Sequence, residues 1–146
     1  MNKDFASLFD RDIKRVIEEI EAFGDDQILW SRQGSISNSP GNLALHIAGN
    51  LRHFIGHILG GNPYTRDRYF EFNGQVEKSK LIENLQEAKA ELKDTFDALK
   101  EDALSKDYPI EVLGYPMSIA HFLIHLNGHL TYHLGQINYY RRLLEA

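Results

Sequence analysis

The sequence of 146 residues contains no cysteine. This absence excludes disulfide bonds, cysteine-ligated zinc or iron–sulfur sites, and a cysteine nucleophile. A chain without a disulfide framework fits a reducing compartment. Any thiol chemistry that this protein performs therefore needs a thiol from outside the chain.

The sequence also lacks long apolar runs and clusters of basic residues. No apolar run reaches the length of a membrane-spanning helix, and residues 1–4 carry two charges where a signal peptide would become apolar. The formal net charge is −5, which disfavours binding to nucleic acid or to an anionic membrane. We expect a cytoplasmic protein whose partners include neither nucleic acid nor membrane.

The overall composition is that of a globular domain. Hydrophobic residues make up 42% of the chain and charged residues 25%, close to the average for folded proteins. A chain of this length can bury one core without disulfide or metal staples. We predict a single domain over residues 1–146.

Four segments repeat apolar side chains at intervals of three and four residues, which is the pattern of amphipathic helices. They cover about residues 5–23, 40–59, 79–100 and 119–144. Ser39 with Pro40 is typical of a helix start, and Ser118 can cap the last helix. Residues 24–39 and 107–116 are predicted to be connections, and residues 62–78 are predicted to be irregular.

Four helices of about 20 residues without strand-like alternation predict an all-α protein, a four-helix bundle. Its connections are longer than the roughly two to eight residues of a simple up-and-down bundle, so they permit crossovers. The sequence leaves the order of the helices around the bundle open.

Seven histidines fall within two short segments, 46–57 and 121–133. The first segment places four polar residues on one helical face: His46, Asn50, His53 and His57. The second repeats histidine at every fourth position along one side of the last helix: His121, His125, His129 and His133. Gln136 continues that side.

Two imidazoles one turn apart on a helix can bind a single metal ion. The sequence offers four such pairs, 53/57, 121/125, 125/129 and 129/133, of which at most two can be sites. Heme ligation is an alternative use of histidines in a bundle. The pattern thus predicts a histidine-rich metal site between two helices without choosing its ligands.

Residues 43–52 read LALHIAGNLR, and residues 127–137 read NGHLTYHLGQI, in which a His-x-x-x-His pair precedes Gly-Gln. Together with Trp30, residues 39–42 and residues 66–72, these motifs resemble the DinB/YfiT superfamily. Its members are bacterial four-helix bundles described as damage-inducible stress-response proteins or as metal-dependent hydrolases. The resemblance covers most of the chain and implies the same fold.

The resemblance implies that one ligand comes from the second helix and a pair from the last helix. By position, these ligands are His46, His129 and His133. Gly128 stands where relatives usually carry an acidic residue, so no acidic neighbour of the metal is expected there. The resemblance, together with an aromatic content of 11%, also predicts a homodimer.

Three neutral imidazoles with an open fourth position suit a divalent metal ion such as zinc or nickel. Such an ion keeps its full charge and lowers the pKa of a bound water or thiol. The superfamily includes thiol-dependent S-transferases and a thiol-dependent isomerase. We predict a metal-dependent enzyme that adds a low-molecular-weight thiol cosubstrate to a small-molecule electrophile.

Two other functions remain open. A metal-dependent hydrolase would use metal-bound hydroxide and a general base, for which Glu71 and Asp67 are candidates, although ion pairs with Arg52, Arg66 or Arg68 are the expected role. A non-catalytic bundle would use the metal for structure or dimerisation.

Several further residues are candidates for contacts near the metal or for the lining of a pocket: Asn50, His53, His125, Tyr132 and Gln136. For His57 and His121 we expect a pocket lining or a place on the surface.

Overall fold

The computed structural model describes residues 1–145, which fold into helices. Four of these helices are long: α1 (Asn2–Ala22), α3 (Pro40–Leu51), α5 (Lys78–Ala98) and α6 (Ile119–Leu144). Residues 1–145 contain no strand, only an isolated antiparallel bridge between Asp107 and Ser118. The predicted all-α class is confirmed, and each long helix lies close to a predicted segment.

Three short helices supplement the long ones: α2 (Asp26–Leu29), α4 (Arg68–Asn73) and the 3₁₀ segment η2 (Glu101–Ser105). The connection 24–39 thus contains α2, and the prediction that residues 62–78 are irregular was wrong for α4. Aspartate caps start both α-helices, because Asp25 accepts a hydrogen bond from the backbone N–H of Gln27 and Asp67 from that of Phe70. Helices this short cannot show a periodic apolar pattern.

The second predicted helix begins as an α-helix and ends as a π-helix. α3 ends at Leu51 and continues directly as η1 (Arg52–His57), a π-helix. π-helical turns are rare and frequently lie at functional sites. Here the π-helix carries His53 and His57, about two and three turns beyond His46 of α3.

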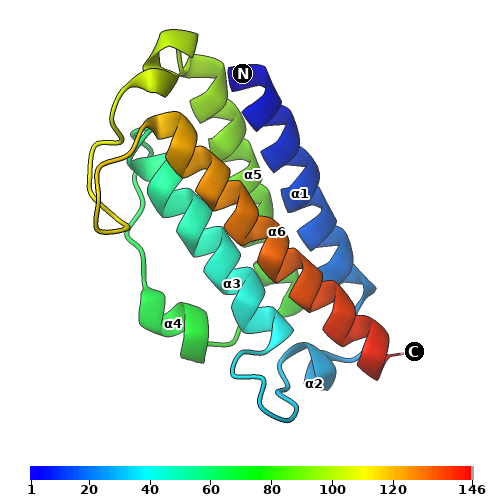
Figure 1. Cartoon of the computed structure of the whole chain (residues 1–146). Coiled ribbons are helices and arrows are strands. Elements are labelled where there is room, and N and C mark those ends of the chain that lie inside the picture. Colours follow the sequence, from blue (N-terminus) through cyan, green and yellow to red (C-terminus); the bar gives the residue numbers. More distant parts are fainter. Residues whose placement is uncertain (146) are drawn as a thin grey trace.

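The four long helices form a closed ring in which α1 and α3 lie diagonally opposite each other (Figure 1). Each of these two helices packs against both α5 and α6. α3 and α5 run in the same direction, so the chain between them returns along the length of the bundle (Figure 1). This return carries α4 against the outside of α3 and settles the helix order that the sequence left open.

The bundle core is built from the apolar stripes of the four long helices. α1 contributes Phe9, Ile13 and Ile20, all fully buried, and α5 contributes Leu81 and Leu85. Ser39 and Ser118 each accept a hydrogen bond from a backbone N–H three residues ahead, which fixes the starts of α3 and α6 as predicted. The two helices that carry the histidines are therefore held at defined positions.

Asn42, in the first turn of α3, fastens the returning chain to the bundle. Its side-chain amide donates hydrogen bonds to the backbone carbonyls of Glu71 and Gly74, at 3.0 and 2.8 Å. Buried carbonyls at the end of a short helix need such partners. The hydrogen bonds hold the end of α4 beside α3.

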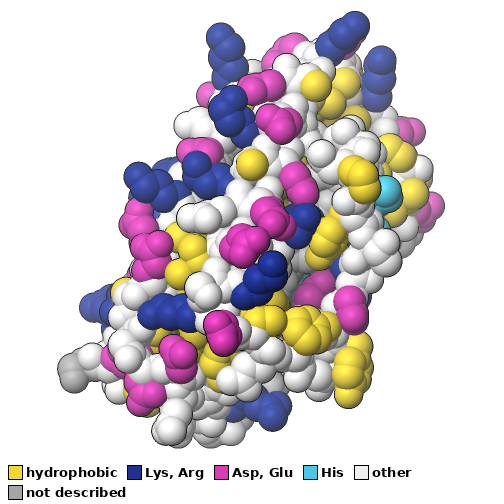
Figure 2. Space-filling model, turned by 180° about the vertical axis from the view of Figure 1, so that it is seen from behind, with side chains coloured by type: hydrophobic (Ala, Val, Ile, Leu, Met, Phe, Trp, Pro, Cys, Tyr) yellow, Lys and Arg dark blue, Asp and Glu magenta, His cyan; other side chains and the backbone are white. Residues whose placement is uncertain are grey.

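The surface opposite the histidine-bearing helices carries both charge signs. Figure 2 shows Lys and Arg side chains interspersed with Asp and Glu over this face, and no broad patch of one sign. No helix within residues 1–145 has the length and apolar character that a membrane span requires.

Candidate metal centre

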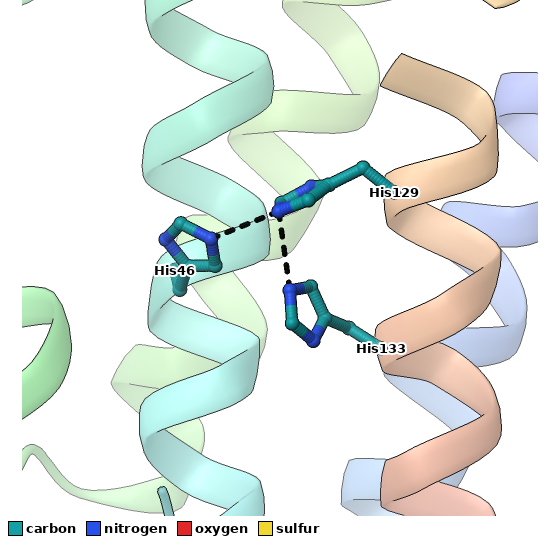
Figure 3. A group of neighbouring side chains, drawn as sticks. All are labelled: His46, His129 and His133. Carbon is teal, nitrogen blue, oxygen red and sulfur yellow. Dashed lines mark hydrogen bonds between the residues drawn. The ribbon is translucent and has the colours of Figure 1, made fainter. Parts of the chain in front are cut away.

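Three histidines converge between α3 and α6 (Figure 3). His46 projects from α3, and His129 and His133 project from successive turns of α6. The Nε2 atom of His129 lies 3.1 Å from Nε2 of His46 and 3.1 Å from Nε2 of His133. The group can hold a metal ion, because one nitrogen from each ring lies within 4.8 Å of the others.

Neighbouring side chains decide which nitrogen of two of these rings carries the proton. His46 donates from Nδ1 to Glu71 Oε1 at 3.0 Å, and His133 donates from Nδ1 to Gln136 Oε1 at 2.8 Å. A neutral imidazole that donates from Nδ1 has a lone pair on Nε2. Both lone pairs therefore point at Nε2 of His129.

This arrangement fits a divalent cation. A single N–H on His129 can donate to one of its two neighbours, so three imidazoles alone cannot satisfy all three nitrogens. A tetrahedral zinc ion with bonds of about 2.0–2.1 Å would separate its ligand nitrogens by roughly 3.3 Å. The two separations of 3.1 Å in the structure are close to that value, so a small adjustment would admit the ion.

Glu71 accepts the hydrogen bond from Nδ1 of His46, the ring nitrogen that faces away from the other two histidines. It is 4% exposed, and Arg66 donates to both of its oxygens, from Nε to Oε2 at 2.9 Å and from Nη2 to Oε1 at 3.0 Å. Burial alone would raise the pKa of Glu71, but hydrogen bonds from His46 and Arg66 outweigh it and bring the pKa below its usual value. The carboxylate is therefore ionised and orients the imidazole, as outer partners of metal-binding histidines commonly do.

The two α6 histidines are kept uncharged by their surroundings. Burial, reinforced by the neighbouring His133 and His46, lowers the pKa of His129 to about 3. Burial also lowers the pKa of His133, against the opposing effect of its hydrogen bond to Gln136. Imidazole binds metal in its neutral form, and both rings hold that form at pH 7.

Of the other candidate residues, two lie against His133 and three are exposed histidines. Gln136 contacts His133, and the ring of Tyr132 lies edge-on to that of His133 at 5.4 Å, with most of the tyrosine exposed. His125 stacks on Phe122 and is exposed. His121 and His57 are exposed as well.

Asn50 and His53 follow His46 on the next turns of the same helix. Asn50 is buried, and neither its Oδ1 nor the Nδ1 of His53 has a hydrogen-bond partner among the described residues. Burial, together with the nearby Arg66, lowers the pKa of His53. These atoms are polar groups that a bound molecule or water can satisfy.

Sequence reasoning missed one contact. Glu71 forms the expected ion pair with Arg66, but it also contacts His46. A signal for this contact is Gly49, because a Cβ at that position would lie 2.0 Å from Glu71 Oε2, and a helix-interior glycine otherwise costs stability.

A cavity of about 450 Å³ opens beside the centre. His133 and Gln136 line it together with Leu43 of α3 and the loop 35–38. His133 therefore borders a space of the size that small molecules occupy.

Comparisons with known proteins show the family and the fold of the chain. The model of the DinB superfamily matches residues 8–137. The structure resembles the crystal structure of a DinB-like protein from Bacillus cereus, with a TM-score of 0.76 and 13% sequence identity over 97% of this chain and 91% of that chain. No curated protein matches the chain in sequence.

Gly49→Ala should weaken metal binding. The added methyl group must displace Glu71 from His46, and loss of such an outer partner typically costs about 10–100-fold in metal affinity. Competition with a chromophoric zinc chelator measures the affinity. Gly135→Ala is the matched control, since no atom lies within 4 Å of the added methyl group; equal affinities in the two variants would contradict the role of Glu71.

Zinc should stabilise protein purified without a polyhistidine tag and stripped with a chelator. At free zinc about 1,000 times the Kd, binding adds about 4 kcal/mol, which for a chain of this size raises the Tm by roughly 8–16 °C. We expect His46→Ala and His133→Ala to lose most of this shift in a thermal melt. His121→Ala, which removes an exposed histidine of the same helix, should keep it; an undiminished shift in His133→Ala would show that zinc binds elsewhere.

Proposed function

This chain belongs to the DinB superfamily, and we propose that it is a divalent-metal-dependent enzyme that transfers a low-molecular-weight thiol to a small electrophilic molecule. The observation that carries this proposal is the convergence of His46, His129 and His133 without a carboxylate in the group. Three neutral ligands support zinc or nickel as the metal.

The ligand set supports thiol activation through its charge. A divalent ion held by three neutral imidazoles keeps its full charge and favours the anion of a bound thiol. The residues of the chain supply the geometry: Glu71 and Gln136 hold His46 and His133 with Nε2 facing inward. The thiol comes from solution, because the chain has no cysteine.

The surroundings of Glu71 favour a thiol over water as the nucleophile. Both of its oxygens accept hydrogen bonds from Arg66, so this carboxylate is poorly placed to act as a general base. Asp67 caps α4 instead. A thiol with a pKa of about 8.5 loses its proton far more readily than water with a pKa of about 15.7, so thiol transfer needs less help from a base.

The proposed reaction needs a compartment in which small thiols stay reduced, which is the cytoplasm. The cavity beside His133 supports a small-molecule substrate.

The assay pairs monobromobimane with a panel of small thiols at pH 7. The thiol sulfur forms a bond to the bromomethyl carbon, bromide leaves with the bonding electrons, and the thiol proton passes to solvent. A thiol with a pKa near 8.5 is only a few per cent ionised at pH 7, so full ionisation would speed the reaction roughly thirtyfold. We expect at least about a tenfold acceleration by zinc-loaded protein over chelated protein and over free zinc.

His129→Gln should abolish that acceleration, and His121→Ala should retain it. Metal-dependent cleavage of ester substrates without any thiol would contradict thiol transfer and favour the hydrolase. Full zinc binding without turnover of any thiol in the panel would favour a non-catalytic bundle.

We also propose a homodimer formed through α6. Ile124 and Tyr132 are exposed on this helix on either side of Gly128, and a Cβ at Gly128 would meet no atom within 4 Å. Exposed apolar side chains one or two turns apart on a single helix face form a surface that a second chain can cover. Sedimentation equilibrium should give twice the mass of 16.8 kDa for the wild type and a monomer mass for Ile124→Asp; a wild-type monomer would contradict the dimer.

A further inference from the structure

The cavity beside the metal centre differs from the centre itself in the chemistry of its lining residues. It lies between the loop 35–38, the start of α3 and the second half of α6. His133 and Gln136 form one end of its wall. A molecule in the cavity would therefore lie directly beside one ring of the metal centre.

The rest of the wall is mostly apolar and incompletely covered. Ile36 is 46% exposed, Tyr139 73% and Leu143 71%, and all three line the cavity. Leu43 and Tyr140 are buried at its floor. Covering apolar side chains that already surround a hollow is the source of affinity in most small-molecule sites.

The wall contains no Asp, Glu, Lys or Arg among its described residues. A charged group placed in this cavity would lose its hydration without gaining an ionic partner, which is unfavourable. The charged groups of the site, Glu71 and Arg66, contact His46 and do not line the cavity. The two sides of the centre therefore differ in polarity.

We propose that this cavity binds an uncharged apolar group of the substrate, an aromatic ring or a short alkyl chain, whose reactive polar end lies at His133 and the metal. This inference rests on the proposed function and deepens it, because it assigns the substrate class to electrophiles with an apolar tail. The volume of about 450 Å³ suits such a molecule and lies within the usual range of about 300–1,000 Å³.

The test uses n-alkyl hydroxamates from two to eight carbons as probes on zinc-loaded, untagged protein. Each probe has the same metal-binding head and differs only in its tail. Each added CH2 that enters an apolar cavity should tighten binding roughly two- to fourfold, as measured by isothermal titration calorimetry. Leu143→Asn and Tyr139→Ser should reduce this gain to less than about 1.5-fold per CH2 while acetohydroxamate binds as before.

Leu113→Asn is the matched control, because Leu113 is an exposed leucine in the loop 107–116 that does not line the cavity. It should keep the wild-type dependence on chain length. Equal binding of all chain lengths to the wild type, or an equal loss in Leu113→Asn, would overturn the proposal.

A second measurement separates the cavity from the metal. Methyl NMR spectra of metal-free protein titrated with 1-hexanol should show shifts of Ile36, Leu43 and Leu143, with Leu113 unchanged. These shifts report on the cavity even if the protein neither binds zinc nor transfers thiols. If Leu143→Asn instead converts a dimer to a monomer in sedimentation, and hexanol shifts no signal of the wild type, a second copy of the chain covers this face and the proposal is wrong.

Discussion

The hydrogen bond between His46 and Glu71 joins the fold of this protein to its candidate site. Glu71 arrives on α4, in the middle of the segment that returns along the bundle from the end of η1 to the start of α5. An ionised carboxylate at 4% exposure is strongly unfavourable without partners, and Arg66 and His46 supply them. Gly49 leaves the space that the carboxylate occupies, and Asn42 holds the end of α4 in place. The long crossover therefore does more than connect two parallel helices, because it sets the proton position on one ring of the centre.

The charged and the uncharged groups of the site lie in different places. The charged groups, Glu71 and Arg66, lie on the outer side of His46. The three converging nitrogens belong to imidazoles, and the pKa values of His129 and His133 are lowered by burial. The cavity beside His133 is lined by apolar and uncharged polar residues. A cation between the rings would face a low-polarity space with no anionic ligand to offset its charge, which is the condition under which it acidifies a bound thiol most strongly.

The long helices and the histidine-rich character of the site could be predicted from the sequence, because both depend on local periodicity. Apolar residues at every third or fourth position mark α1, α3 together with η1, α5 and α6 within about three residues of their ends. The choice among the histidine pairs could not be made from spacing. A stripe with a histidine at every fourth position turns by about 40° per step, so His121 and His125 become exposed while His129 and His133 meet His46. The superfamily resemblance singled out those three residues, and their contact depends on the packing of α3 beside α6. The contact of Glu71 with His46 could not be predicted from periodicity, since it arises from a six-residue helix and joins residues 25 positions apart; Gly49 marks the space but does not identify the side chain that fills it.

Anomalous diffraction at the zinc edge, from crystals of untagged protein grown with one equivalent of zinc, tests the central claim most directly. The account predicts one strong peak between α3 and α6, within bonding distance of Nε2 of His46, His129 and His133, with a fourth position open toward the cavity. It also predicts that Nδ1 of His46 keeps its hydrogen bond to Glu71 when the metal is bound. A peak at His53 and His57, or at His121 and His125, with none between the three converging rings, would contradict the account.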